Sequence, residues 1–304
     1  MSGTISLLDC TLREAPVDGL LWGAEFIEKF IFGLEEANVD IIEIGFLKNT
    51  EYKEGSTIFS TPTQIEKYIP LHAKSQYVAL VDYGRFNVDD LTPNNGRTID
   101  GIRVCFKKEE KDFVFDYARK IMEKGYWVSI QQVDTRGYSD EELLQVIERI
   151  NELKPKSYSI VDTFGSLYGE DAEYIYKLIN HNLEKDIALG FHAHNNLMLA
   201  ASNSQKFITD LWGTRKLIVD GSAHGCGRGA GNAHTELLAE YINLKHFGNY
   251  DINKLLDIID DILPELMQKG KWGYSIPYFI AGIHSTHVFN VDFLLSRHNI
   301  RSKD

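Results

Sequence analysis

The sequence contains few cysteines and no long apolar stretch. Its 304 residues include three cysteines, Cys10, Cys105 and Cys226, and none of them belongs to a CxxC pair. An odd and sparse cysteine content argues against a disulfide framework and is typical of the reducing cytoplasm. No window comes near the ~20 apolar residues that span a bilayer, and residues 1–4 lead into a predicted strand rather than a signal peptide. We therefore expect a cytoplasmic protein with no membrane partner.

A basic surface is also missing. The net charge is −12 and the pI is about 5.3, so the surface repels nucleic acid phosphates and anionic membranes. Lys107 and Lys108 are followed at once by Glu109 and Glu110, which is typical of a solvated patch. Hydrophobic residues make up 43% and charged residues 25% of the chain, an ordinary globular balance. Nucleic acid is therefore not an expected partner.

What the chain does have is a regular alternation of short apolar runs with longer amphipathic segments. Eight runs predict strands, at 5–10, 40–45, 77–81, 101–106, 127–132, 158–161, 187–191 and 217–219. Helical patterns between them cover 25–37, 114–124, 140–153, 172–182 and 197–210, and Ser139 with Glu142 forms a plausible capping box. Strands that alternate with helices imply parallel βαβ units. Eight units predict a (β/α)₈ TIM barrel, with an open doubly wound sheet as the alternative.

The last part of the chain lies beyond the eighth unit. We expect a barrel domain of residues 1–249 and a C-terminal helical extension of residues 250–304 packed on it. Within the extension the pattern predicts a helix at 252–268, a turn at 274–278 and a further helix at 279–289. Composition does not shift sharply at this point, so the extension is predicted to be an appendage of the barrel.

Unusual polar residues gather where the predicted strands end. Active sites of TIM barrels form at the carboxyl ends of the strands. Five segments meet this condition, around Arg13 and Glu14, Glu43, Asp162, His192 and His194, and Asn232. The fold is expected to bring these segments together although they are far apart in the sequence.

His192 and His194 give the most specific indication of chemistry. Residues i and i+2 of a strand point to the same face, so the two imidazoles can share one metal ion, for which Mn²⁺, Mg²⁺, Fe²⁺ and Zn²⁺ are suitable. The alternative is a pair of strand histidines bonded to their neighbours. Glu14 is the natural acidic ligand and Asn232 the natural amide ligand. The alternative for Glu14 is a charged surface residue in a loop. The alternative for Asn232 is the N-cap of a helix that begins at residue 233.

The other charged residues at these strand ends fit a supporting role. Arg13 has the donors to neutralise a carboxylate or an enolate oxygen. Glu43 lies in an apolar run, where burial without a partner is costly, so we expect an Arg13–Glu43 pair beneath the metal. Asp162 is expected to orient Arg13 or a ligand histidine, or to end its strand in a turn. For Cys226, in the glycine-rich stretch 225–231, no motif supports activation.

Taken together, these motifs resemble the DRE-TIM metallolyase superfamily, and most closely its 4-hydroxy-2-oxovalerate aldolase-like group, related to HMG-CoA lyase. The resemblance covers residues 5 to about 244 and rests on five motifs, 9-DCTLRE-14, 42-IEIG-45, 161-VDTFG-165, 190-GFHAHNN-196 and 227-GRGAGN-232. It implies a metal held by Glu14, His192 and His194, with Asn232. It also implies that Arg13 stabilises an enolate and that Glu43 corresponds to the glutamate in the second strand of the family.

Two positions depart from the family pattern. The family has aspartate where this chain has Glu14, and the extra methylene moves the carboxylate by ~1.5 Å. The hydroxyoxovalerate aldolases place a catalytic histidine shortly after the arginine, whereas this chain has 15-APVD-18. The usual acid or base is therefore missing or replaced. Asn196 stands where the related synthases have aspartate, which favours the aldolase side.

The resemblance implies a divalent-metal-dependent lyase that cleaves or forms a carbon–carbon bond in a 4-hydroxy-2-oxo acid through a pyruvate-type enolate, with Mn²⁺ or Mg²⁺ favoured and Zn²⁺ as the alternative. A metal-bound water, Asp18, or a tail residue such as Tyr274 or His284 would carry the proton. The expected partners are a small oxo acid and other copies of the chain in a homo-oligomer. The alternatives are an acyl-CoA condensing enzyme, a non-catalytic binding barrel, and a Schiff-base aldolase using Lys107.

Overall fold

Eight parallel strands form a closed barrel, which confirms the predicted (β/α)₈ fold. The computed structural model describes residues 4–14, 21–269 and 272–297. Strand β1 pairs with β9 on one side and with β2 on the other, and these two pairings close the ring. The barrel strands are β1 Ile5–Asp9, β2 Ile41–Leu47, β4 Gln76–Asp82, β5 Gly101–Phe106, β6 Trp127–Gln132, β7 Ser157–Asp162, β8 Ala188–Ala193 and β9 Leu217–Gly221.

The strands are almost continuously buried, because the barrel interior covers one face of the sheet and helices cover the other. Every residue of β7 and β8 is buried. Strands β2 and β9 run two residues beyond their predicted ends, and those extra residues lie at the carboxyl ends where a TIM barrel builds its site. A short ninth strand, β3 (Ile58–Phe59), pairs with the end of β2 outside the barrel ring.

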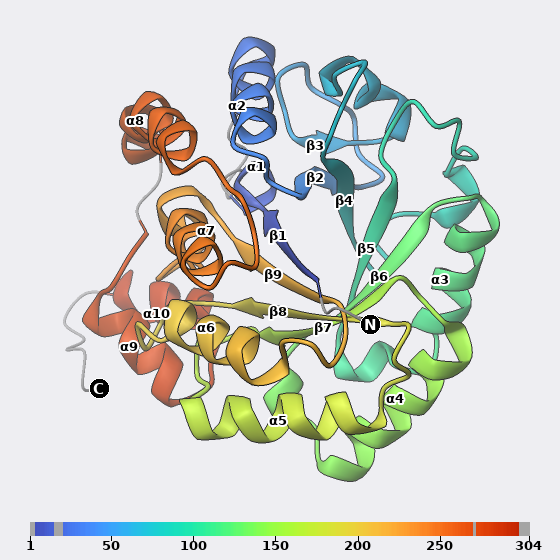
Figure 1. The fold of residues 1–304 in the computed structure, drawn as a ribbon, viewed down its shortest axis with the longest axis vertical. Helices are drawn as coiled ribbons and strands as arrows, with labels where there is room; N and C mark the ends of the chain where they lie inside the picture. The colour runs from blue at the N-terminus through green and yellow to red at the C-terminus, as the bar shows by residue number, and fades with distance from the viewer. Residues whose placement is uncertain (1–3, 15–20, 270–271, 298–304) are drawn as a thin grey trace.

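Helices surround the strands in the expected positions (Figure 1). The apolar residues that predicted the first long helix, including Phe30, Ile31 and Leu34, are buried on one face of α2. The predicted capping box at the start of α4 is present, with Ser139 accepting from the Glu142 amide. The barrel helices are α1 Thr11–Glu14, α2 Ala24–Glu36, α3 Val114–Glu123, α4 Asp140–Leu153, α5 Gly169–Asn182, α6 Ala200–Leu211 and α7 Thr235–Leu244.

Two of the strand connections contain no α-helix. The chain passes from β2 to β4 through β3 and two 3₁₀ turns, η1 Pro62–Gln64 and η2 Glu66–Tyr68. It passes from β4 to β5 through the 3₁₀ turn η3 Val88–Asp90. No helix is predicted from the sequence in either stretch. These connections therefore consist of loops, 3₁₀ turns and the short strand β3.

Helices follow the barrel, as predicted, but the end of the chain is divided differently. Helix α8 (Ile252–Lys269) packs against α2 and α7. The helix predicted at 279–289 is wrong, because this stretch belongs to two helices, α9 Ile276–Ile283 and α10 Val288–Leu295. Ser285 between them has a φ of 47°, and the His287 side chain caps the new helix by accepting from the Phe289 amide.

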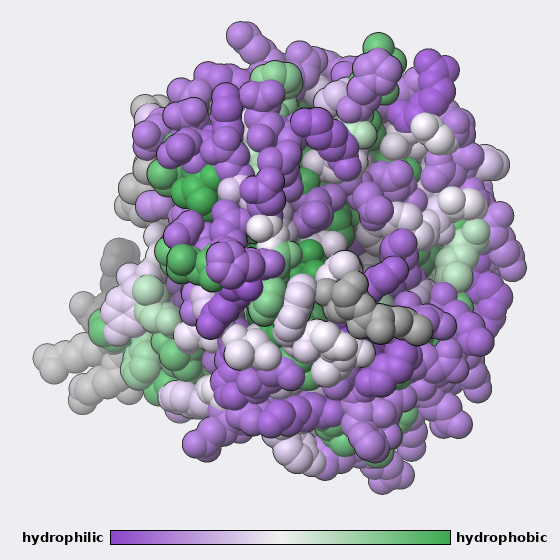
Figure 2. All heavy atoms as spheres, viewed as in Figure 1, coloured by the Kyte–Doolittle hydropathy of each residue, from purple (hydrophilic) through white to green (hydrophobic). Residues whose placement is uncertain are grey.

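The helices α9 and α10 lie beside the carboxyl ends of the strands. The Asn196 side chain donates to the Tyr278 carbonyl at 2.9 Å, and the Gly273 amide donates to the Gly229 carbonyl at 3.1 Å. Most of the face in Figure 2 is hydrophilic, with hydrophobic residues gathered at the lower left over these helices. Exposed apolar residues of α9 and α10 include Ile276, Phe279 and Phe293. Across the described ranges, no helix combines the length and apolar character that crossing a membrane requires.

Candidate metal centre

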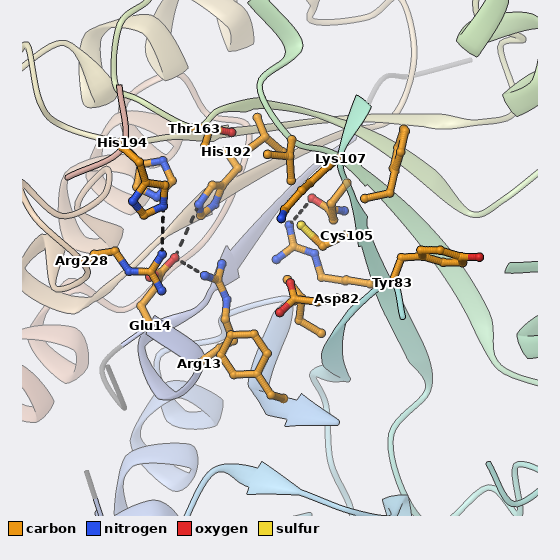
Figure 3. A pocket seen from close by; sticks show the side chains of 18 of the residues that line it. Arg13, Glu14, Asp82, Tyr83, Cys105, Lys107, Thr163, His192, His194 and Arg228 are labelled. Carbon is orange, nitrogen blue, oxygen red and sulfur yellow. Dashed lines mark hydrogen bonds and ion pairs between the residues drawn. The ribbon is translucent and has the colours of Figure 1, made fainter. Parts of the chain in front are cut away.

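A cavity of about 730 Å³ opens at the carboxyl ends of the barrel strands. Side chains from α1, from the end of β8 and from the loop after β9 meet in it (Figure 3). Its lining includes the predicted residues Arg13, Glu14, His192 and His194. The sequence argument that strand-end polar residues would converge therefore holds for these four.

Glu14, His192 and His194 lie close enough to share one metal ion. Each offers a ligand atom, and the three atoms all lie within 4.8 Å of one another. Glu14 is in the last position of α1, which follows β1, whereas His192 lies near the end of β8 and His194 directly follows that strand. His192 Nε2 lies 3.6 Å from Glu14 Oε1. The geometry brings the predicted ligand set together, and its role in binding a metal stays a prediction.

The outer nitrogens of both imidazoles are held by acceptors. His192 Nδ1 lies 3.0 Å from a carboxylate oxygen of Asp220, and His194 Nδ1 lies 2.9 Å from the Asp162 carbonyl oxygen. Because a carbonyl and an ionised carboxylate only accept, we assign the proton to Nδ1 in each ring. The Nε2 lone pair then faces the cavity. Metal-binding histidines are commonly oriented in this way by their second nitrogen.

The charges of Glu14 and His194 also suit a divalent cation. Burial opposes ionisation of Glu14, but Arg13 and the two histidines lower its pKa to about 2, so it is a carboxylate at neutral pH. Burial and the neighbouring His192 lower the pKa of His194 to about 4, so that ring is neutral. A carboxylate and neutral imidazoles are the forms that bind metal ions.

Asn232 lies beside this group with an unsatisfied oxygen. Its Nδ2 donates to the Cys226 carbonyl at 2.9 Å, while its buried Oδ1 has no hydrogen-bond partner among the described residues. The alternative role as a helix cap is wrong, because α7 begins at Thr235 with His234 as its N-cap. An orphaned buried oxygen next to a carboxylate and two imidazoles fits a metal ion, since such an atom otherwise carries a desolvation penalty.

The glycine-rich loop makes this placement of Asn232 feasible. Gly231 has a φ of 78°, and a Cβ added to it would lie 2.0 Å from the Gly225 carbonyl oxygen. The Asn232 amide donates to that same carbonyl at 3.1 Å. Only glycine tolerates both the left-handed backbone and the close approach. The tight turn of this loop therefore accounts for a glycine at position 231.

A buried chain of alternating charges supports the cluster from below. The predicted Arg13–Glu43 pair is confirmed, with Arg13 Nε donating to Glu43 Oε2 at 2.7 Å. Arg103 Nη1 donates to the other Glu43 oxygen at 2.9 Å, and its Nη2 donates to Asp220, which holds His192. Arg13 also pairs with Glu14. The charges of Glu14, Glu43 and Asp220 are thus fixed by two arginines, which satisfies groups that would otherwise be costly to bury.

A β-bulge shapes the backbone beside Glu43. The register between β2 and β4 shifts between Glu43 and Gly45. Gly45 has a φ of 151°, and an added Cβ would lie 1.9 Å from the Thr57 carbonyl oxygen. Bulges of this kind re-aim side chains next to active sites. The bulge therefore accounts for a glycine directly after the apolar run that carries Glu43.

Asp162 takes a different role from the first one expected of it. Its carboxylate accepts from the amides of Ser166 at 2.8 Å and Leu167 at 3.3 Å, so it closes the turn after β7. Burial raises its pKa to about 6. The carboxylate orients neither Arg13 nor a ligand histidine; the backbone carbonyl of Asp162 holds His194 instead.

The remaining predicted residues fall outside the cluster. Asp18 lies outside the described residues. Tyr274 and His284 are exposed, and neither is among the described residues that line the cavity. The prediction that one of these two tail residues carries the proton is therefore wrong. The tail reaches the cavity through residues 286–289 instead, including His287. Cys226 is buried, and burial raises its thiol pKa far above the ordinary value, so it is no activated nucleophile.

Sequence reasoning missed Asp220, Arg103 and His287. Asp220 and Arg103 each interrupt an apolar strand, as Glu43 does, so the argument applied to Glu43 would have found them. His287 carried no such signal, because its position depends on how the two final helices pack.

The comparisons with known proteins agree with this geometry. The HMGL-like family model matches residues 5–262. An oxaloacetate decarboxylase of Mycobacterium tuberculosis is 25% identical over 95% of this chain and 84% of its own length. A 4-hydroxy-2-oxovalerate aldolase of Bacillus thuringiensis is 24% identical over 89% of this chain and 80% of its own length.

Solved structures show the same fold. The N-terminal domain of a Bacteroides vulgatus protein described as an aldolase superposes with a TM-score of 0.80 at 23% identity, covering 96% of each chain. An HMG-CoA lyase of Bacillus subtilis superposes with a TM-score of 0.69 at 16% identity, covering 87% of this chain and 94% of its own. With a family model that spans most of the sequence, the chain belongs to the HMGL-like family, the DRE-TIM metallolyases, and is a metal-dependent lyase.

Proposed function

We propose that the protein is an aldolase that cleaves or forms the C3–C4 bond of a 4-hydroxy-2-oxo acid through a pyruvate-type enolate. The observation that carries the proposal is the cluster of Glu14, His192 and His194 with the Arg13 guanidinium beside it in one cavity. The names of the sequence relatives support it, because decarboxylation of oxaloacetate and cleavage of a hydroxyoxovalerate both pass through the enolate of pyruvate. We propose Mn²⁺ or Mg²⁺ as the ion, with Zn²⁺ as the alternative.

Glu14, His192 and His194 would hold the ion, with Asn232 Oδ1 as a fourth donor. When bound, a divalent cation supplies a Lewis acid for the enolate. Arg13 adds hydrogen-bond donors beside the three candidate ligands. The hydrogen bond from its Nε to Glu43 fixes the plane of the guanidinium. Because Arg13 is in place before the reaction, its guanidinium would stabilise charge that develops on the enolate oxygen without reorganisation of the side chain.

His287 is the proposed carrier of the 4-hydroxyl proton. Among the described residues that line the cavity, it is the one histidine besides the two candidate ligands. Burial, followed by the nearby charges of Arg228 and Lys107, lowers the pKa of its ring, so the ring is neutral at pH 7 and able to accept a proton. In bond formation the same ring returns a proton to the new hydroxyl oxygen. This assignment replaces the histidine that the sequence lacks after Arg13.

A pyruvate-release screen on metal-defined protein tests the proposal. Purified protein is analysed for bound metals, stripped, and reloaded with Mn²⁺, Mg²⁺ or Zn²⁺. Pyruvate release from a series of 4-hydroxy-2-oxo acids and from oxaloacetate is then followed. We expect release only with metal, loss of release in His194→Ala, and normal release in the exposed control His72→Ala. Pyruvate release that does not depend on metal would contradict the proposed function, and so would the absence of pyruvate release from every acid tested.

A further inference from the structure

The outer part of the cavity carries cationic side chains that are not held in ion pairs. Lys48, Lys107 and Arg228 all line it, and in the part of the chain that the structure describes none of them forms an ion pair. Arg13 and Arg103, deeper in the cavity, are paired with Glu14, Glu43 and Asp220, as described above. The unpaired charges stand out because the protein as a whole has a net charge of −12.

Among the described residues, Asp82 and Glu110 line the outer cavity without forming an ion pair with these three cations, although the charge of Asp82 favours the protonated form of Lys48. Asp82 lies 4.0 Å from the Arg85 guanidinium, which is its nearest ionic partner. Glu110 accepts from the backbone amide of Lys107 at 2.7 Å and so closes the turn after β5. Both carboxylates therefore have partners elsewhere. Three unpaired cations in one cavity repel one another, and such an arrangement is stabilised when an anion enters.

Aromatic rings hold two of these cations in place. The Lys48 ammonium lies 4.1 Å from the centroid of the Phe46 ring, and the Arg228 guanidinium lies 4.5 Å from that of Phe289. Arg228 Nη1 is also 3.4 Å from His287 Nε2. Figure 3 shows Arg228 and Lys107 directed into the cavity from different sides. The cations are thus arranged around the space next to the proposed proton carrier rather than scattered over the surface.

We propose that the substrate carries a second anionic group, a carboxylate or a phosphate ester, on its aldehyde half, and that Arg228, Lys107 and Lys48 bind it. This inference rests on the proposed aldolase function and adds the substrate class. Pyruvate has six heavy atoms and fills a small part of a 730 Å³ cavity, so there is room for a longer second half. Charge-assisted hydrogen bonds from Arg and Lys recognise both carboxylates and phosphates.

The reaction balances without any further reagent. In bond formation, the pyruvate methyl group first gives a proton to the neutral His287 ring, and the electron pair of that C–H bond forms the enolate. C3 of the enolate then attacks the aldehyde carbon. The new carbon–carbon bond forms as the carbonyl π bond breaks, and the resulting alkoxide takes one proton from His287. Cleavage is the reverse, with the proton returned to His287 and the electron pair of the broken bond forming the enolate. The distal anion takes no part in these steps, so Arg228 and Lys107 are specificity residues.

Matched aldehyde pairs test the inference. Mn²⁺-loaded protein is given pyruvate with butanal or succinic semialdehyde, and with glyceraldehyde or glyceraldehyde 3-phosphate. We expect kcat/KM to be at least about tenfold higher for one of the anionic aldehydes than for its neutral partner, and the pair that responds identifies carboxylate or phosphate. Arg228→Gln and Lys107→Gln should each lower that ratio severalfold. Arg119→Gln, an exposed cation paired with Asp116 on α3, should leave the ratio unchanged.

Two further measurements separate this inference from the proposed function. Deuterium exchange into the pyruvate methyl group reports enolate formation without any aldehyde. If exchange occurs but neither anionic aldehyde is preferred, the anion site is overturned and the aldolase stands; if no exchange occurs with metal, both fall. Glycerol 3-phosphate and succinate are also titrated into metal-free protein. The anion site is supported if either compound binds and Lys107→Gln weakens that binding. It is contradicted if neither compound binds.

Discussion

Replacing Asp220 with asparagine should damage both the stability of the barrel and the candidate metal site. Asp220 is buried at the end of β9, where one of its oxygens accepts from Arg103 and from His192 Nδ1. Burial alone would raise its pKa, but Arg103 and His192 lower it to about 2. The substitution keeps the shape of the side chain and removes the charge on which both contacts depend.

The expected loss of stability follows from that pKa. A shift from 3.8 to about 2 corresponds to ~2–3 kcal/mol of stabilisation at neutral pH. Because the folded pKa is the lower one, this stability is present above pH 4 and is lost as the pH falls through about 2. Loss of one partner from a buried ion pair commonly costs about 3–5 kcal/mol. Arg103 retains Glu43, so we expect roughly 2–4 kcal/mol.

The effect on metal binding comes from the histidine tautomer. An asparagine can turn its NH₂ group toward His192 Nδ1, which moves the ring proton to Nε2 and blocks the lone pair that faces Glu14. Loss of such an outer partner typically lowers metal affinity by about 10–100-fold.

Two assays measure these effects separately. Urea unfolding in the presence of a chelator gives the stability of the metal-free protein, and calorimetric titration of Mn²⁺ gives the affinity. Asp116→Asn is the control, since its side chain is 74% exposed and pairs with Arg119 on the helix surface, where a pair contributes less than about 1 kcal/mol. If Asp220→Asn unfolds at the wild-type urea concentration and binds Mn²⁺ equally well, the role assigned to Asp220 is wrong.

Three further changes have defined outcomes. Arg13→Lys keeps the charge but loses the fork of donors, so kcat for pyruvate release should fall about 10–100-fold while oxalate inhibition changes little; a normal kcat would remove Arg13 from the reaction. Glu14→Asp withdraws the carboxylate by ~1.5 Å and should weaken Mn²⁺ binding in calorimetry, whereas tighter binding would indicate a degenerate site. For His287, whose lowered pKa keeps it neutral, the acid limb of kcat/KM should lie below pH 6.5 and disappear in His287→Gln, and an unchanged limb would exclude it.

The barrel was predictable because its signal is local. Each strand is a short apolar run, and the burial of both sheet faces makes that run nearly continuous, as in β7 and β8. Positions of strands and helices therefore follow from periodicity alone. The break between α9 and α10 depends on a single strained backbone position, Ser285, and on the cap formed by His287. Such a break leaves the apolar pattern of 279–289 unchanged and cannot be recognised from it.

The candidate site was predictable only in part, for a related reason. Glu14, His192 and His194 stand at strand ends, and the barrel topology alone brings strand ends together. Their supports are of another kind: a backbone carbonyl holds His194, and a charge on the neighbouring strand holds His192. The residues that lie next to each other on neighbouring strands are determined by strand register, and the register cannot be predicted from the sequence pattern.

The central claim is that Glu14, His192 and His194 hold one divalent ion that makes the pyruvate enolate. The most direct test follows deuterium exchange of the pyruvate methyl group during a Mn²⁺ titration of wild type, His192→Ala and His194→Ala, with bound metal measured in the same samples. We expect wild type to bind one ion and to exchange only when it is bound. Both variants should stay folded and lose the ion and the exchange together. Equal metal content and equal exchange in all three proteins would contradict the account.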